Sequence, residues 1–598
     1  MRAALRGRTT LRLAGQGARV RRKFAKGALT PVRRIHKLSA ILAVSAAALG
    51  APARATDGLA GPYLAGRLAG LGSDYVAASD YFDRALAADP GNPQLVENLI
   101  IGEIGRGRVA KAAAVAAGAA GEEIGQIADL VVLADAARRG DFAGAIAALD
   151  AGRSGGGLVD GLYRAWALVG LGQMSEATLA FDKVAESAGL KSFGLYHKAL
   201  ALAAAGDFEA ADEIFSGDAG GPLRATRRGV IAHAEVLSQL ERNADAVELI
   251  DKVFGQTDDA VLVDLRRRLE AGETLPFTLV SDATDGISEV FLSVASALVG
   301  ESTDINALAY ARMAEYLSPG LAEAHLLCAQ ILDAQGQHDL ASETYKSIAR
   351  DDPAYAAAEL GRADSLIEAE RWDAAIEVLE KLSKDMPARA DIWVSLGDIY
   401  RRRERFDEAA GTYSKAIDLF KAEEPRQWVV YYTRGIAYER LKDWSRAEAD
   451  FRKALALNPD QPSVLNYLGY SYLERKERYD EALSMIERAV AAQPGNGAIV
   501  DSLGWALFRL GRYDEAVVQM EQAVELMPVD PVVNDHLGDV YWAVGRHREA
   551  SFQWRRALSF KPDTEEDAAR IRRKIEIGLD AVLKEEGAEP LAVSTNDG

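Results

Sequence analysis

Small side chains recur in the C-terminal half of the chain every 34 or 35 residues, with aromatic residues in the stretches between them. Each period carries one glycine, then two alanines and a proline at nearly constant distances. The glycines are Gly435, Gly469, Gly504 and Gly538. Small side chains let two helices approach closely where they cross, and a proline cannot continue a helix. The period therefore predicts a pair of packed helices that ends at each proline.

The same template extends towards the N-terminus. Further units start near residues 288, 322, 356 and 390, and a clear unit spans 66–90, with weaker units after it. We count about fourteen helical hairpins, six before residue 260 and eight after residue 287. A single hairpin cannot bury its apolar face, so stacked neighbours must supply the core. We therefore expect an all-α, right-handed superhelical solenoid.

The repeat pattern divides the chain into six predicted segments. The period breaks at 270–287, where glycine and proline cluster, and this predicts a linker. After the last repeat, one apolar stripe predicts a capping helix, formed by Ile571, Ile575, Leu579 and Leu583. The segments are a signal peptide at 1–55, a divergent alanine-rich array at 56–269, the linker at 270–287, a second array at 288–562, the capping helix at 563–586 and a disordered tail at 587–598.

The N-terminal segment has the pattern of a secretory signal. Residues 1–55 hold 13 Lys and Arg and no acidic residue, and the apolar run Leu38–Gly50 precedes a small-x-small site at 53–55. These three features together indicate a cleavable signal. We expect cleavage after Ala55 and a periplasmic protein, with peripheral membrane association left open. The long basic region leaves the translation start open, and Arg21–Phe24 leaves a twin-arginine route open beside the preferred general secretory route.

Charge and cysteine content narrow the partners that we expect. Without the signal the chain keeps 57 Lys and Arg against 89 Asp and Glu, a formal charge of about −32. Such a surface repels nucleic acid and favours neutral or basic partners. The one cysteine, Cys328, falls on the buried side of a predicted helix and is expected to be a core residue. Because no cysteine lies directly after the signal, we expect no lipid anchor.

The sequence contains no recognisable catalytic or cofactor-binding motif. There is no phosphate loop, no paired cysteine or histidine metal spacing and no nucleophile elbow in the sequence. Ser502 and His536 take the same position in adjacent repeats and would lie about 10 Å apart, since that is the spacing of packed helices. A catalytic Ser–His pair needs hydrogen-bond distance. We therefore expect no enzyme, no cofactor and no metal site.

The first helices of the last three repeats are the candidate binding surface. Their exposed positions combine Tyr and Trp, which give rigid contact area, with Asn, Asp and His, which pair with backbone amides. This composition is typical of a groove that recognises an extended peptide. The predicted partner-binding residues are Asn466, Tyr467, Tyr470, Asp501, Ser502, Trp505, Phe508, Arg509, Asp535, His536, Asp539 and Trp542.

The repeat resembles the tetratricopeptide repeat family, and the C-terminal segments resemble a narrower group. The columns of glycine, alanine and proline carry the family resemblance. The segments NYLGY, VDSLGWALFRLGRYDEA and DHLGDVYWAVGRHREA are similar to periplasmic adaptors that partner a carboxyl-terminal processing protease. That resemblance implies a non-catalytic superhelix that binds the protease and presents envelope proteins to it. The chain departs from this group because it lacks the lipidated cysteine.

Three functions remain open from the sequence. The first is a non-catalytic scaffold or adaptor of the bacterial cell envelope, whose protein partners include a processing protease and its substrates. The second is a periplasmic chaperone or assembly factor for an envelope or secretion complex. The third, a substrate-binding arm of an enzyme, is disfavoured because the repeats leave no segment for a catalytic domain. None of these functions requires nucleic acid or a small-molecule substrate.

Overall fold

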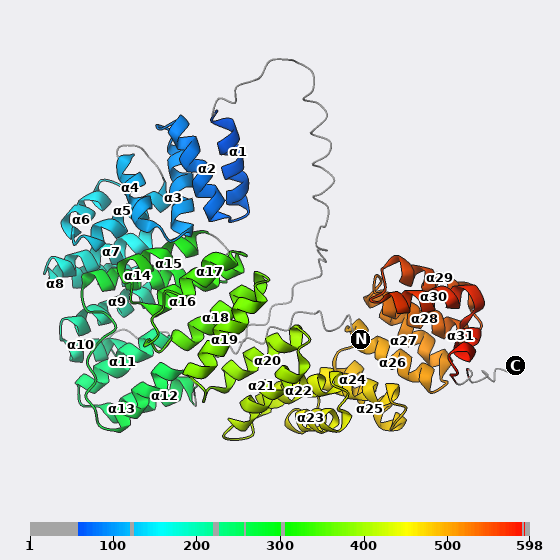
Figure 1. Ribbon diagram of the computed structural model, residues 1–598. Coiled ribbons are helices and arrows are strands. Elements are labelled where there is room, and N and C mark those ends of the chain that lie inside the picture. The colour runs from blue at the N-terminus through cyan, green and yellow to red at the C-terminus, as the bar shows by residue number, and fades with distance from the viewer. Residues whose placement is uncertain are drawn as a thin grey trace, which may run out of the picture. The chain divides into compact units, whose positions relative to one another are not determined.

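The computed structural model describes residues 58–119, 125–218, 226–255, 257, 259–300, 305–588 and 591. These residues form 31 α-helices and a short 3-10 turn, with no strand in the described part of the chain (Figure 1). The predicted all-α fold is therefore confirmed. The signal peptide at 1–55 and most of the tail at 587–598 lie outside the described residues.

The chain divides into two compact units, which meet between Met386 and Pro387. We call the described residues up to Met386 the N-terminal unit and those from Pro387 the C-terminal unit. The predicted break at 270–287 is not this boundary. The division falls instead inside the second predicted array, where the sequence period runs on without interruption.

The N-terminal unit begins with six helical hairpins and one additional helix. The hairpins are α1 (Ala60–Leu71) with α2 (Tyr75–Ala88), α3 (Pro93–Gly105) with α4 (Val109–Gly118), α5 (Gln126–Arg138) with α6 (Phe142–Asp150), α7 (Gly157–Gly170) with α8 (Met174–Glu186), α9 (Lys191–Ala204) with α10 (Phe208–Phe215), and α11 (Arg227–Gln239) with α12 (Asn243–Phe254). The count of six is as predicted. The additional helix, α13 (Ala260–Glu270), was not distinguished in the sequence pattern.

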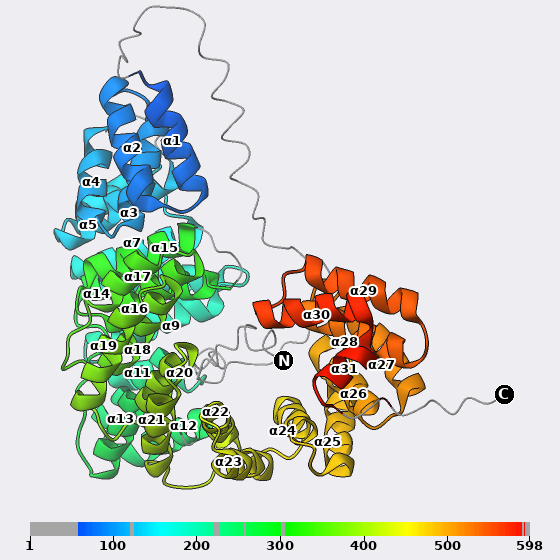
Figure 2. The same cartoon turned by 45° about the vertical axis from the view of Figure 1, so that its right-hand side comes forward.

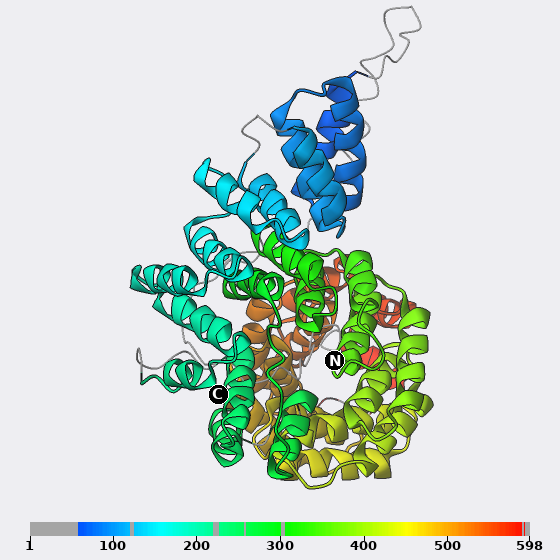
Figure 3. The same ribbon diagram turned by 90° about the vertical axis from the view of Figure 1, so that its left-hand side faces the viewer.

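Three more hairpins complete the N-terminal unit. They are α14 (Ala283–Leu298) with α15 (Ile305–Leu317), α16 (Ala322–Ala334) with α17 (His338–Tyr345), and α18 (Tyr355–Glu368) with α19 (Trp372–Asp385). The chain turns back at α14, because α14 packs on α7 and α9, and α15 packs on α3 and α5. Figure 3 shows the green helices of this region against the cyan helices of the first hairpins. One hydrophobic core therefore joins residues that the sequence assigned to two separate arrays.

The segment between α13 and α14 is packed against α11 and does not behave as a free linker. Thr278 donates from its backbone nitrogen and its hydroxyl to Glu235, at 2.8 and 2.7 Å. The backbone nitrogen of Leu275 donates to Ser238 Oγ at 2.8 Å, and the side chains of Leu275 and Val280 are buried. This described segment forms no strand, and α14 already begins inside the predicted linker.

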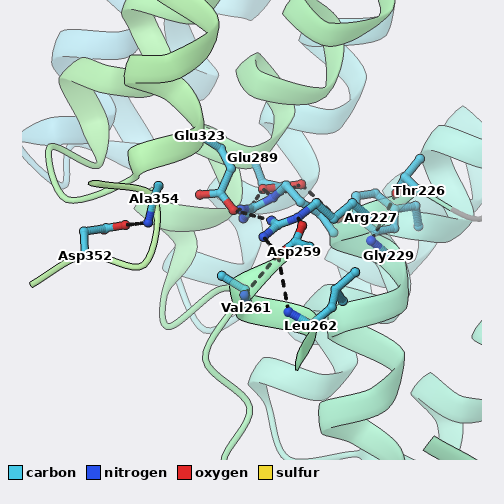
Figure 4. Close-up of polar contacts among 12 residues, drawn as sticks. Thr226, Arg227, Gly229, Asp259, Val261, Leu262, Glu289, Glu323, Asp352 and Ala354 are labelled. Atoms are coloured by element: carbon cyan, nitrogen blue, oxygen red, sulfur yellow. Dashed lines mark hydrogen bonds and ion pairs between the residues drawn. The ribbon is translucent and has the colours of Figure 1, made fainter. Parts of the chain in front are cut away.

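A set of ion pairs holds the returning helices in place. The Arg228 guanidinium of α11 pairs with Glu289 of α14 at 2.7 Å, and the Tyr196 hydroxyl of α9 donates to the same carboxylate at 2.8 Å. Arg227 bridges Asp259, at 2.6 Å, and Glu323 of α16, at 2.9 Å (Figure 4). Charged groups of the first hairpins are thus satisfied by the chain that follows them.

The C-terminal unit contains five hairpins and two terminal helices. The hairpins are α20 (Ala390–Arg402) with α21 (Phe406–Asp418), α22 (Trp428–Arg440) with α23 (Trp444–Leu457), α24 (Pro462–Glu474) with α25 (Tyr479–Ala492), α26 (Gly497–Arg509) with α27 (Tyr513–Leu526), and α28 (Pro531–Ala543) with α29 (His547–Ser559). The longer loop before α22 contains the 3-10 turn Pro425–Gln427. With the nine hairpins of the N-terminal unit, this gives the predicted total of fourteen.

The glycine column packs as the period predicts. A Cβ atom added to Gly435 would lie 2.7 Å from the ring of Phe451, and one added to Gly538 would lie 2.4 Å from the ring of Trp554. In each case the aromatic ring belongs to the second helix of the same hairpin. Because no larger residue fits without a shift, these glycines set how closely the two helices approach.

The end of the C-terminal unit differs from the single capping helix that the sequence predicts. Gly578, with φ of 84°, separates α30 (Glu565–Ile577) from α31 (Leu579–Glu585). Ile571 and Leu579 are buried as expected, but Lys574 is also fully buried and is the most occluded charged side chain of this region. No helix in the described part of the chain is long and apolar enough to cross a membrane.

Candidate partner-binding face

The first helices of the hairpins form one side of the C-terminal unit. Helix α20 touches α22, and α26 touches both α24 and α28, whereas the second helices make no comparably close contacts with one another. The first helices therefore lie on the inner side of the stack (Figure 2). Counted from the glycine of each first helix, five positions carry side chains on this side: three before, two before, one after, four after and five after. We call these side chains the first-helix face.

Asp501, His536 and Trp505 form the centre of this face. His536 Nδ1 lies 3.0 and 3.1 Å from the two carboxylate oxygens of Asp501. The imidazole stacks on the Trp505 indole, with ring centroids 4.1 Å apart and planes 14° from parallel. Trp505 also stacks on buried Phe508, with centroids 4.9 Å apart, and its Nε1 donates to Glu474 Oε1 at 3.2 Å.

This arrangement changes the pKa of His536. Burial alone would lower the pKa of the imidazole, because it disfavours the charged form. The charge of Asp501 and the hydrogen bond to it act in the opposite direction, with a further contribution from Asp535, so the pKa of His536 is raised. The protonated ring then carries a positive charge against the indole face, which is a favourable cation–π arrangement.

Ser502 does not take part in this cluster. Its hydroxyl donates to the backbone oxygen of Ala498, one turn earlier in α26, at 3.0 Å. His536 bonds Asp501 from a neighbouring helix, so the two residues that would make a Ser–His pair have different partners. The described residues also contain no group of three or more His, Cys, Asp or Glu side chains that could hold a metal ion. Cys328 is buried, and burial raises the pKa of its thiol.

Asp535, Asp539 and Trp542 are held by the terminal helices. Lys574 Nζ of α30 lies 2.9 Å from Asp535 and 2.7 Å from Asp539. The Trp542 indole donates to Asp580 of α31 at 2.8 Å and stacks on His547 of α29. These three predicted groove residues therefore contact α30 and α31. The part of the first-helix face that remains open to a partner is shorter than the sequence suggested.

Asn466, Tyr470 and Arg509 lie further along the face and have no such partners. The buried Oδ1 of Asn466 has no hydrogen-bond partner among the described residues. Tyr470 and Arg509 are half-buried, and neither makes a hydrogen bond or ion pair in the described part of the chain. Burial, assisted by the charges of Glu474 and Asp501, raises the pKa of the Tyr470 hydroxyl, which therefore stays protonated.

Tyr467 has a mainly structural position. Its ring is buried, 5.2 Å from the ring of Phe451 and 5.8 Å from that of Tyr432, and its hydroxyl donates to Glu439 at 3.3 Å. Two residues of this neighbourhood, Tyr432 and Glu474, were absent from the predicted set. Tyr432 occupies the repeat position of Asn466, so the 34-residue period could have identified it. Glu474 occupies the repeat position of Arg509, so the period could have identified it as well.

Comparisons with known proteins agree with the repeat architecture. The family model described as tetratricopeptide repeat matches residues 326–382, 360–424, 432–497 and 473–531. A TPR repeat-containing protein of Pseudomonas aeruginosa is 38% identical over 87 residues, which is 14% of this chain and 15% of that protein. The alignment therefore spans only a small part of this curated relative.

Solved structures resemble parts of the chain at low superposition scores. The APC/C hetero-tetramer Cut9–Hcn1 aligns with 87% of this chain and 96% of its own, at 18% identity and a TM-score of 0.36. The structure of YrrB, a TPR protein with an unusual peptide-binding site, aligns with 33% of this chain and 99% of its own, at 20% identity and a TM-score of 0.27.

Proposed function

We propose that this chain is a non-catalytic scaffold that binds a partner polypeptide on the first-helix face of the C-terminal unit, around Asn466, Tyr470, Trp505 and Arg509. Tetratricopeptide repeats imply a protein–protein interaction scaffold. The observation that carries the location is that the polar groups of Asn466, Tyr470 and Arg509, beside half-buried Trp505, have no hydrogen-bond partner among the described residues. Such groups are suited to peptide recognition, because a bound backbone would supply the missing hydrogen-bond partners.

The first helices of the N-terminal unit are less suited to this role. Helices α3, α5, α7 and α9 already contact α14 and α15. Their polar groups are used as well, since the Tyr310 hydroxyl of α15 donates to the backbone oxygen of Gly155 at 2.7 Å and Tyr316 donates to Asp135 at 3.0 Å. We infer that helices α3, α5, α7 and α9 do not themselves capture a peptide.

Replacing Tyr470 and Trp505 together with alanine tests the proposed face. We expect loss of partner capture with nearly unchanged helicity and melting, because both side chains are only half-buried. The matched control is Val518→Ala with Phe552→Ala, which removes exposed apolar side chains from the second helices α27 and α29. Circular dichroism and pull-down of partners measure the two outcomes. If the Tyr470/Trp505 variant unfolds, these residues are core and the assignment is wrong.

The cellular setting is a second part of the proposal. The signal-like segment at 1–55 supports export to the periplasm, and the segment resemblance described above supports a carboxyl-terminal processing protease and its substrates as partners. Capture of partners from a periplasmic extract, with identification by mass spectrometry, tests this. Recovery of the protease supports the adaptor. Recovery of only an envelope or secretion complex supports a chaperone or assembly factor instead.

A further inference from the structure

Arginine recurs on the first-helix face at one repeat position, five residues after the glycine column. Arg402, Arg440 and Arg509 occupy it in α20, α22 and α26, and Glu474 occupies it in α24. Arg440 and Arg509 are half-buried, and Arg402 is exposed. None of the three guanidinium groups has a hydrogen bond or ion pair with any residue that the structure describes.

The missing partners distinguish these arginines from their neighbours. Arg434 forms a two-pronged pair with Asp450 at 2.8 Å, and Arg512, three residues beyond Arg509, pairs with Glu515 at 2.6 Å. A guanidinium carries five donors in a planar fork that matches a carboxylate. Half-buried guanidinium groups without acceptors, in a chain of formal charge −19, therefore point to an acceptor that comes from outside the unit.

Each half-buried arginine lies near a tyrosine of helix α24. Arg440 lies close enough to Tyr467 to oppose the rise in the pKa of that hydroxyl, which burial and Glu439 cause. Arg509 acts in the same way on Tyr470, against burial, Glu474 and Asp501. Arg440 also lies over the ring of Phe406, 5.6 Å from its centroid.

The acidic side chains of the face are already engaged. Asp501 is paired with His536, and Asp535 and Asp539 are paired with Lys574. Glu439 accepts from the Tyr467 hydroxyl, and Glu474 accepts from the Trp505 indole. The half-buried guanidinium groups of Arg440 and Arg509 are therefore left without an acidic partner on this face.

We propose that the first-helix face binds an extended polypeptide segment that carries two carboxylates, one paired with Arg440 and the other with Arg509. The two arginines lie two first helices apart, about 16–20 Å at the usual 8–10 Å between packed helices. An extended chain covers about 3.3 Å per residue, so the carboxylates are about five or six residues apart. This inference rests on the proposed function and adds the chemistry of the partner.

A display library of random dodecapeptides, selected on the full chain, tests the inference. The variant is Arg440→Gln with Arg509→Gln. The matched control is Arg446→Gln with Arg512→Gln, which removes the same charge from two paired arginines outside the face. We expect the wild type and the control to enrich peptides with two Asp or Glu residues five or six apart. The double variant loses that enrichment, while circular dichroism shows an unchanged fold.

Synthetic copies of an enriched peptide then distinguish the source of each carboxylate. Replacing one acidic residue by its amide weakens binding about tenfold, as expected for the loss of one charged hydrogen-bonded pair. A terminal amide in place of the free carboxyl terminus has the same effect only if the terminus supplies one of the carboxylates. Fluorescence anisotropy with labelled peptides measures both changes.

Other outcomes overturn the inference in recognisable ways. If enriched peptides lack acidic residues, or if the double variant retains the acidic enrichment, the two arginines do not bind carboxylates of the partner. Should such peptides still require Tyr470 and Trp505, the proposed function stands without this inference. If no variant and no wild-type selection enriches any peptide, both proposals fail.

Discussion

The two units are built from the same helical hairpin, but their first helices have different partners. In the N-terminal unit, α3, α5, α7 and α9 contact α14 and α15 of the same chain. In the C-terminal unit, the described chain reaches this face through α30 and α31 at one end, where Lys574 pairs with Asp535 and Asp539. The difference shows that a repeat supplies a surface, and that the rest of the chain decides whether that surface becomes core or stays available.

The largest effect is expected from Glu289→Ala in the N-terminal unit. Glu289 is buried and holds both Arg228 and Tyr196, so its removal leaves a buried guanidinium without its closest acceptor. Breaking a buried pair in this way costs about 3–5 kcal/mol of unfolding free energy. Urea unfolding followed by circular dichroism measures the loss. Glu270→Ala, which removes a more exposed pair with Arg266, is the control and should change stability by less than about 1 kcal/mol.

A slightly smaller loss, about 3 kcal/mol, is expected from Lys574→Ala in the C-terminal unit. The buried ammonium group neutralises Asp535 and Asp539, and without it these carboxylates keep α30 from docking. Hydrogen exchange should show early opening of α30 and α31. Lys584→Ala, at an exposed position of α31, should leave exchange unchanged. Unchanged protection in Lys574→Ala would show that the terminal helices dock through their apolar residues alone.

Gly286→Ala tests the close approach of α14 to the first hairpins. An added Cβ would lie 2.2 Å from the ring of Trp166 in α7, so the two helices must move apart. Overpacking of this kind costs about 1–3 kcal/mol. Gly411→Ala is the control, because nothing lies within 4 Å of its added Cβ, and alanine favours a helix by about 0.5–1 kcal/mol. Thermal melting of both variants gives opposite signs if the N-terminal unit is packed as described.

The smallest effect is a pH dependence of the C-terminal unit through His536. Its raised pKa, set by Asp501 and Asp535 against burial, means that the folded state holds the proton more tightly than the unfolded state. Protonation of His536 therefore contributes its full stabilisation below the pKa of the unfolded state, about 6.5. This contribution is lost as the pH rises through the pKa of the folded state. We expect the melting temperature to fall more steeply from pH 6 to 8.5 in the wild type than in His536→Gln. Equal slopes would contradict the charged pair.

The sequence predicted the repeat, and the side of the helix on which each repeat position lies, better than it predicted the contacts that the candidate binding residues make. Gly435 and Gly538 lie at the helix crossings, as their spacing indicates, because the steric demand is local to one hairpin. The period also placed Trp505 and His536 on the same side of neighbouring helices, where they stack. It did not reveal that Asp539 binds Lys574, because the terminal helix lies outside the period. The predicted set also left out Tyr432, although this residue shares a repeat position with Asn466.

The sequence by itself determined the local architecture: fourteen hairpins, their spacing and the direction in which each position faces. Those features depend on contacts between neighbouring helices in the chain, and the same contacts recur in every repeat. Only the tertiary structure decided that α14 returns to α7 and that the compact units divide at Met386. These two features depend on contacts between residues more than a hundred positions apart, such as Gly286 with Trp166. Such a contact occurs once in the molecule, so a repeating sequence pattern cannot predict it.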